Sequence, residues 1–241
     1  RWATVVEELV GYLLRDLHDD AGGFYSAEDA DSEGVEGRFY VWSDSEIREL
    51  LGDSAHNDDA DEVIAYFGVT PEGNFEGANI LNVVVRTAPR PAAVERALPL
   101  LLEARSQRNR PGLDDKVLLA WNALMVRALA EAAAVFERPD WMVAARTTAQ
   151  FLDTDMRDAD GRLQRSWQAG EARHAAYAED YAALLGAQLT LAELDSIAWL
   201  DDVTRTAHDL VDLFHDPAGG GFFTSGSDAH DLLVRGKDLF D

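Results

Sequence analysis

The chain has 241 residues, of which 47% are hydrophobic, enough for one large domain or two small ones. A formal net charge of −24 argues against nucleic acid as a partner, because binding a phosphate backbone requires clustered Lys and Arg. The sequence has no cysteine, which excludes disulfides and thiolate sites, and no run of eighteen apolar residues, so no membrane span is predicted.

The chain begins in or just before a helix. Trp2, Val5 and Leu9 keep helical spacing, and this pattern predicts a first helix from about Trp2 to His18. Because the first residue is Arg1 rather than Met, we expect a fragment of a longer protein whose targeting signals lie outside this sequence.

An acidic stretch from Gly22 to Trp42 follows, in which carboxylates lie between glycines and aromatic pairs. Glycine permits positive φ, so Gly22-Gly23 and the later Gly34 and Gly37 predict a hairpin with a polar tip. Its acids repel one another unless they are solvated or face a cation or a hydroxyl-rich ligand. A solvated surface loop and a functional loop are both open at this point.

Further helices are predicted by apolar periodicity and by capping signals such as Ser43-Asp44-Ser45-Glu46. The turn at Gly73 is expected to lead into a β-rich run over 80–84. The helix after Lys116 is the most apolar and is expected to be buried on most sides. In chain order the expected helices cover about 43–51, 63–67, 91–105, 116–132, 139–151, 176–194 and 196–215.

Three helix ends carry similar turn sequences, which is the strongest architectural signal. Each combines Asp with Gly and a following apolar residue, and together they indicate a repeat of helical hairpins with its loops on one face. A helical bundle with purely structural turns is the alternative. The three segments are 17–25, 156–163 and 214–223.

Several motifs, in this order across almost the whole chain, resemble one family. They are Gly23-Phe24-Tyr25-Ser26-Ala27-Glu28-Asp29-Ala30-Asp31-Ser32-Glu33-Gly34, Glu36-Gly37-Arg38-Phe39-Tyr40-Val41-Trp42, Gly73-Asn74-Phe75-Glu76-Gly77, Asp114-Asp115-Lys116-Val117-Leu118 with Trp121-Asn122, Glu179-Asp180-Tyr181, Gly221-Phe222-Phe223 and Arg235-Gly236-Lys237-Asp238. The chain is similar to thioredoxin-domain-containing proteins of uncharacterised function, the spermatogenesis-associated thioredoxin-like proteins.

The resemblance implies a fold. It points to an all-α chain, a partial (α/α)6 toroid of helical hairpins with short β-hairpins at one face, related to the six-hairpin glycosidases and N-acylglucosamine 2-epimerase. Residues 1–241 would be a fragment of that toroid, lacking the parent's thioredoxin-like domain and terminal helices. A cytoplasmic location is expected, as is contact with the thioredoxin-like domain of the same parent chain.

A polar central cavity is the site that the resemblance implies, and its ligand would be a carbohydrate or polyol. The predicted catalytic acids are Asp31, Asp115 and Asp180. Predicted substrate-binding residues are Glu28, Asp29, Trp42, Lys116, Trp121, Asn122, Tyr181, Arg235, Lys237 and Asp238. No metal site and no cofactor are predicted.

Three functions are open for such a site. An enzyme acting on sugars would be a glycoside hydrolase using two carboxylates, or an epimerase using bases such as His174, although a lone His is more often structural. The second is a non-catalytic ligand-binding or scaffold module with structural charge clusters. The third is calcium binding at Asp29, Asp31 and Glu33, which is disfavoured because Tyr40 stands where a bidentate Glu is required.

Overall fold

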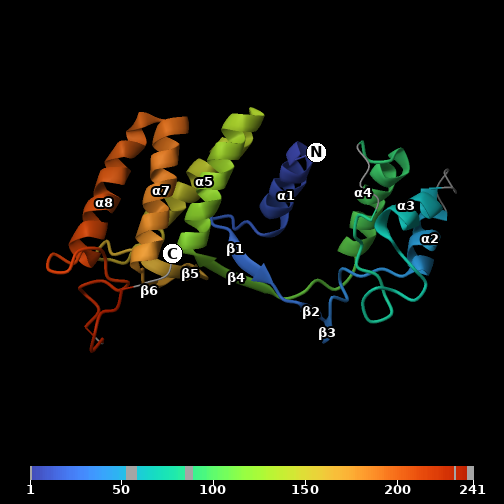
Figure 1. Ribbon diagram of the computed structural model, residues 1–241, viewed down its shortest axis with the longest axis horizontal. Coiled ribbons are helices and arrows are strands. Elements are labelled where there is room, and N and C mark those ends of the chain that lie inside the picture. The colour runs from blue at the N-terminus through green and yellow to red at the C-terminus, as the bar shows by residue number, and fades with distance from the viewer. Residues whose placement is uncertain (1, 53–58, 85–88, 231, 238–241) are drawn as a thin grey trace. The chain divides into compact units, whose positions relative to one another are not determined.

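The structure is a computed structural model that describes residues 2–52, 59–84, 89–230 and 232–237 (Figure 1). It divides into two units. Unit 1 comprises Glu28–Leu113, and unit 2 comprises Trp2–Ala27 and Asp114–Asp241.

Unit 2 is built mainly from helices that pack as hairpins. Two residues, Glu137 and Arg138, separate α5 from α6, and Glu137 takes the left-handed conformation (φ 54°) that ends α5. Such a short connection makes α5 and α6 an antiparallel helical hairpin. The helices are α1 (Trp2–Asp16), α5 (Leu119–Phe136), α6 (Pro139–Thr154), α7 (Ala178–Leu194) and α8 (Leu200–Phe214), the last preceded by the short 3-10 helix η1 (Ile197–Trp199).

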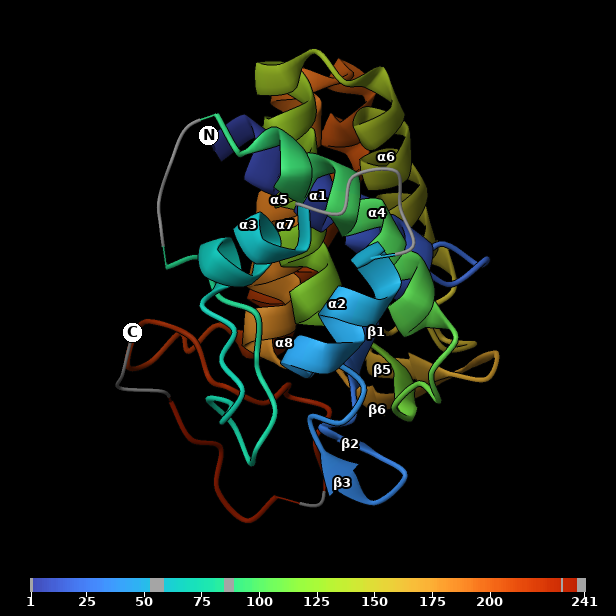
Figure 2. The same ribbon diagram turned by 90° about the vertical axis from the view of Figure 1, so that its right-hand side faces the viewer.

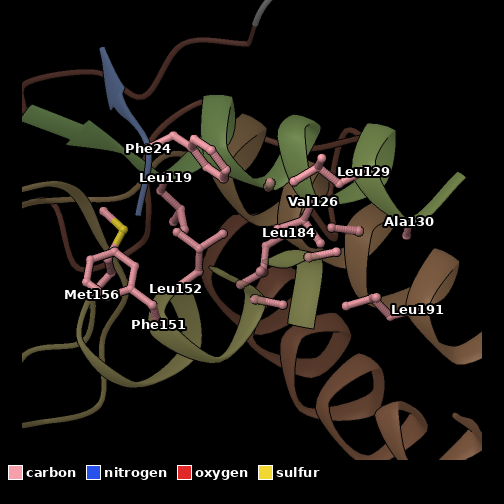
Figure 3. Close-up of a cluster of buried hydrophobic side chains, with 14 of the residues drawn as sticks. Phe24, Leu119, Val126, Leu129, Ala130, Phe151, Leu152, Met156, Leu184 and Leu191 are labelled. Carbon is pink, nitrogen blue, oxygen red and sulfur yellow. The ribbon is translucent and has the colours of Figure 1, made fainter. Parts of the chain in front are cut away.

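The core of unit 2 lies between α5, α6 and α7 (Figure 3). Leu119 and Val126 of α5, Leu152 of α6 and Leu184 of α7 are all fully buried in it. By length and composition α5 could cross a membrane, but these buried side chains show that it is the core helix of this unit. The prediction that α5 is buried on most sides is only partly correct, since Trp121 is 59% exposed.

A four-stranded sheet lies where α5 and α7 begin (Figure 1). Val117 pairs with Trp167, and Ser166 pairs with Arg173, both in antiparallel register. The sheet corrects the all-α prediction: the chain is helix-rich, but polar segments between its helices pair as strands. In sheet order the strands are β1 (Tyr25–Glu28), β4 (Leu113–Leu118), β5 (Gln164–Gln168) and β6 (Glu171–Ala175).

The predicted repeat of turns is confirmed after α1, α6 and α8. In each turn the carboxylate of an Asp, namely Asp19, Asp158 or Asp216, accepts a backbone N–H two residues later, and an antiparallel bridge closes the loop. The first two turns lead into strands β1 and β5 of the same sheet. These two turns therefore lie at the same end of the hairpins, as predicted.

Gly23 shows why the first of these turns requires glycine. A Cβ added there would lie 2.8 Å from Cγ1 of Val117 and 2.9 Å from Cε1 of Phe151. Both are core side chains, so the backbone of the turn packs directly on the core of unit 2.

Among its described residues, unit 1 contains three helices that pack on one another around Ile47, Val63 and Val94, which are fully buried (Figure 2). Ser43 and Glu46 form the predicted capping box at the start of α2, with Ser43 N–H donating to Glu46 at 2.7 Å. The helices are α2 (Asp44–Gly52), α3 (Asp59–Phe67) and α4 (Ala92–Ser106).

The acidic hairpin of unit 1 is confirmed but short. It pairs β2 (Asp31–Ser32) with β3 (Val35–Glu36). Its two-residue turn is Glu33-Gly34, with φ of 55° and 75°, the geometry of a type I′ hairpin turn.

The predicted β-rich run over 80–84 is wrong. The backbone N–H of Val84 donates to Tyr66 O and that of Asn82 donates to Phe67 O, so this segment satisfies the end of α3. The last carbonyls of a helix lack hydrogen-bond donors within the helix. Here the N–H groups of Asn82 and Val84 donate to two of them, and the segment does not pair as a strand.

Candidate functional site

Asp180 is the best-defined acid among the predicted catalytic residues. It is 1% exposed at the start of α7, where its carboxylate accepts the backbone N–H of Tyr177 at 2.8 Å and Nη1 of Arg165 at 3.1 Å. The backbone of Ala120, at the start of α5, makes a smaller contribution that also stabilises the ionised carboxylate. Asp180 thus joins the starts of α5 and α7 to strand β5.

The electrostatics of Asp180 reflect a balance of burial and pairing. Burial raises its pKa, because removing water disfavours the ionised form, while the Tyr177 amide and the Arg165 charge oppose the rise. A carboxyl with a raised pKa is a feature common at functional sites and is also found in structural ion pairs.

Two exposed aromatic residues are neighbours in sequence of groups near this carboxylate, or contact it through their own backbone. Trp121 directly follows Ala120 and is 59% exposed, and Tyr177 is 41% exposed. The guanidinium of Arg165 lies 4.8 Å from the centre of the Tyr177 ring, and it also pairs with Glu179 at 2.6 Å. We call Trp121, Arg165, Tyr177, Glu179 and Asp180 the helix-start site.

Asp115 and Lys116 lie on strand β4, not at a helix start as predicted, because the chain stays extended until Leu118. The carboxylate of Asp115 accepts Nε2 of Gln168 at 2.5 Å on the adjacent strand. Lys116 is half-exposed and pairs with Asp114 at 3.1 Å.

Tyr25, on strand β1, is influenced by two acidic residues, Asp19 and Asp115. Its hydroxyl donates to Asp19 at 2.5 Å, and this hydrogen bond is the main cause that raises the pKa of Tyr25 to about 12. The charge of Asp115 adds to the rise. The phenol is therefore held protonated as a donor to the first Asp turn.

Three predicted substrate-binding residues are buried, and their role in binding a substrate stays a prediction. The amide of Asn122 accepts Phe24 N–H at 2.6 Å and donates to Phe24 O and Leu118 O, so it is fully used within the core. Tyr181 is fully buried, with its hydroxyl accepting from Arg162 at 2.9 Å. Trp42 is 4% exposed in unit 1.

Arg235 and Lys237 hold the C-terminal segment in place, and their role in binding a substrate stays a prediction. Arg235 donates to the carbonyls of Ser225 and Leu213, and Nζ of Lys237 donates to Asp216 and Gly220 O, both at 2.6 Å. Asp238, predicted to bind substrate, lies outside the described residues.

The predicted acids of the hairpin belong to unit 1. Glu28 is almost buried and bonds to Tyr40 and Arg110. Asp29 accepts the Asp31 N–H at 3.4 Å, and Asp31 is exposed on β2. Convergence of these acids with Asp115 and Asp180 into one cavity stays a prediction, as does the catalytic role of Asp31.

A metal site receives no support in the part of the chain that the structure describes, since no group of three His, Asp or Glu side chains there is arranged to hold an ion. The acidic hairpin is flanked by strands and loops and not by two helices, unlike an EF-hand.

Arg165 and Tyr177 were missed by the sequence analysis, although they complete the helix-start site. The only signal for them is local: Arg165 lies in a polar segment with strand-like alternation, and Tyr177 directly precedes the matched Glu179-Asp180 motif.

Comparison with known proteins gives relatives but no reaction. No family model matches the chain. It is 32% identical to spermatogenesis-associated protein 20 of Mus musculus and of Homo sapiens over 280 aligned residues, and 29% identical to an uncharacterised protein of Caenorhabditis elegans over 271. These alignments cover 98%, 98% and 96% of this chain but 35%, 36% and 36% of the relatives. The chain therefore spans about a third of the length of the curated relatives it matches.

Two solved structures show a weak likeness. A cellobiose 2-epimerase from Bacillus thermoamylovorans gives a TM-score of 0.42 at 13% identity, covering 89% of this chain and 57% of that one. A sugar epimerase from a ruminal bacterium gives 0.46 at 10% identity, covering 97% and 60%. TM-scores at this level do not establish a shared fold.

Proposed function

We propose that this chain binds a carbohydrate at the helix-start site of unit 2. The observation that supports the proposal is a pair of exposed aromatic residues, Trp121 and Tyr177, beside the ion-paired start of α7. The Tyr177 ring lies 4.8 Å from the guanidinium of Arg165, which pairs with Glu179 and Asp180. Function is argued from this site and not from any likeness of fold.

The chemistry of the site suits a sugar. The face of an indole or phenol ring packs against the apolar C–H face of a sugar ring. Glu179 is 61% exposed and can accept from hydroxyls, while Arg165 has five N–H donors. Neutral sugars present both donors and acceptors, so they satisfy a site in which the charges are already paired.

We further propose that the hairpins belong to an (α/α)6 toroid and that the parent protein is carbohydrate-active. The recurring Asp turn after α1, α6 and α8 supports a repeat of hairpins. A thioredoxin-like domain of the same parent chain and a cytoplasmic location are part of this proposal. Such a partner domain would make the chain a ligand-binding module within a larger assembly.

The proposal is tested with Trp121→Ala. Isothermal titration of the 241-residue chain with a panel of neutral mono- and disaccharides should give binding that Trp121→Ala weakens by about tenfold, the effect of losing one aromatic contact. Trp2→Ala is the matched control, because Trp2 is 73% exposed on α1 and far along the chain from the site. Equal loss in both variants, or no binding by any sugar, would refute the proposal.

Catalysis at this site is the second candidate, and the raised pKa of Asp180 is the observation that favours it. A raised pKa favours the protonated form of a carboxyl, which is the form that a general acid in sugar chemistry requires. Asp180→Asn would then abolish turnover of a bound sugar while Trp121-dependent binding remains. If no sugar that binds is turned over by the unsubstituted chain, the site is a binding site alone.

A further inference from the structure

Unit 1 contains a polar pocket that the proposed function does not use. It has a volume of about 450 Å³ and lies between the acidic hairpin, the start of α2 and the end of α4. Of the residues that line it, only Glu33 had a predicted site role, in the disfavoured calcium site. Those that matter for its chemistry are Glu33, Arg38, Glu46, Gln107, Arg108 and Asn109.

Arg108 is the fixed element of this pocket. Its Nη1 donates to the carbonyls of Phe39 at 3.0 Å and Val41 at 2.7 Å, and its guanidinium lies 4.1 Å from the centre of the Trp42 ring. The side chain is 23% exposed. Two carbonyls and one ring face therefore hold the guanidinium in a single orientation.

The other edge of this guanidinium has room for a ligand. Among the described residues Nε of Arg108 makes no hydrogen bond, and Nη2 contacts only Oε1 of Glu46 at 3.4 Å. Glu46 is committed elsewhere, because its Oε2 accepts both the N–H and the hydroxyl of Ser43 in the capping box of α2. The Nε and Nη2 edge has the fork geometry that binds a carboxylate through two parallel hydrogen bonds.

A second cationic side chain lies near Arg108. Arg105 stands beside Arg108, with its guanidinium 5.4 Å from the Phe39 ring centre and 5.5 Å from that of Tyr40. Burial lowers the pKa of Arg108, the Glu46 charge opposes this, and the Arg105 charge adds a smaller decrease, but an arginine stays protonated. A bound carboxylate would pair with this buried charge.

The rest of the pocket supplies neutral or balanced polar groups. Gln107 and Asn109 line it with amides, and Arg38 pairs with Glu33 at 3.1 Å in a half-exposed ion pair. Amides and a balanced ion pair offer both donors and acceptors, as hydroxyl groups require.

We propose that this pocket of unit 1 binds a small hydroxylated carboxylate of the sugar-acid type, with its carboxylate on the Nε and Nη2 edge of Arg108 and its hydroxyls on Gln107, Asn109 and the Glu33–Arg38 pair. The ligand differs from the neutral sugar proposed for unit 2 by its charge. The two sites share no residue.

Two substitutions with opposite expected effects test the proposal on the 241-residue chain. Isothermal titration with D-glucuronate should show binding that Arg108→Lys weakens by about tenfold or more, because lysine keeps the charge but loses the fork. Glu46→Gln should tighten binding, since it removes the competing carboxylate, and Gln is accepted at this capping position. Arg96→Lys is the control, because Arg96 pairs with Asp59 outside the pocket.

Further ligands and variants separate this pocket from the helix-start site. D-glucose should bind Arg108→Lys and the unsubstituted chain equally, and acetate should bind more weakly than glucuronate. Gln107→Ala should also weaken glucuronate binding, and it leaves the Arg108 contacts in place. It therefore tests the pocket even if Arg108→Lys does not fold. Trp121→Ala should leave glucuronate binding unchanged.

Clear results would overturn the proposal. They are no detectable binding of glucuronate or gluconate, an unchanged affinity in Arg108→Lys, weaker binding in Glu46→Gln, or loss of glucuronate binding in Trp121→Ala. None of these outcomes bears on whether a neutral sugar binds in unit 2.

Discussion

Nζ of Lys237 lies 2.6 Å from Oδ2 of Asp216, and this ion pair closes the turn that follows α8. The same oxygen has an equivalent role in the other two turns: in Asp19 it accepts the Tyr25 hydroxyl, and in Asp158 it accepts Gln164 Nε2. Each turn therefore uses one carboxylate oxygen for backbone N–H groups and the other for a side chain farther along the chain.

The ion pair in this turn makes the stability of the folded chain depend on pH. Lys237 lowers the pKa of Asp216 from 3.8 to about 2, so the ionised form is stabilised in the folded state. The contribution is complete above the unfolded pKa and is lost as the pH falls toward 2. In denaturation midpoints, Asp216→Asn should therefore be less stable than the unsubstituted chain at pH 6, and the difference should vanish near pH 2. Asp160→Asn, whose carboxylate makes no hydrogen bond within the described part, should show no such trend; a constant difference for Asp216→Asn would contradict the account.

Asn122 is predicted to be a structural residue. Asn122→Asp keeps the acceptor for Phe24 N–H but loses the donor to two buried carbonyls, so it should lower the free energy of unfolding by about 2 kcal/mol. Trp121→Ala, one residue away but exposed, should change it by less than about 0.5 kcal/mol. Urea denaturation measures both. Similar effects in the two variants would show that Asn122 is not anchored in the core.

Gly23 is predicted to tolerate no side chain. Gly23→Ala places a methyl group against Val117 and Phe151 and should destabilise by about 1–3 kcal/mol. Gly11→Ala on α1 is the matched control, because no atom lies within 4 Å of its added Cβ, and it should stabilise by up to about 1 kcal/mol. Thermal unfolding should give shifts of opposite sign; a neutral Gly23→Ala would mean that the first turn does not pack as described.

Two fully buried threonines are predicted to respond differently to the loss of a hydroxyl. Thr206 has no hydrogen-bond partner within the described residues, so Thr206→Val should be neutral or stabilising by about 1 kcal/mol. Thr148 donates to Gly22 O at 2.7 Å, so Thr148→Val should cost about 1–2 kcal/mol. Denaturant unfolding compares them directly. Equal destabilisation would indicate a partner for Thr206, such as a buried water.

The sequence predicts those features that depend on local chemistry. The Asp turns follow from Asp and Gly at fixed spacing, and the capping box at Ser43 follows from a short motif. The strands β5 and β6 were not predicted, because their polar residues pair only once the turn at Gly170, with φ 83°, brings them together.

In the candidate site, too, the sequence predicts residues with a local signal and misses those that depend on long-range pairing. Asp180 was identified, but its partner Arg165 was not, because the contact depends on how β5 pairs beside α7. Asn122 was assigned to a ligand because nothing local reveals that Phe24, 98 positions away, takes up its amide. Exposure and long-range pairing thus decide which polar residues remain available to a ligand.

The most direct measurement of the central claim is the indole N–H spectrum of the six tryptophans during titration with a neutral sugar. Binding at the helix-start site predicts that the Trp121 resonance shifts with added sugar, while the resonances of exposed Trp2 and fully buried Trp141 stay in place. A sugar that binds without moving the Trp121 resonance would contradict the account.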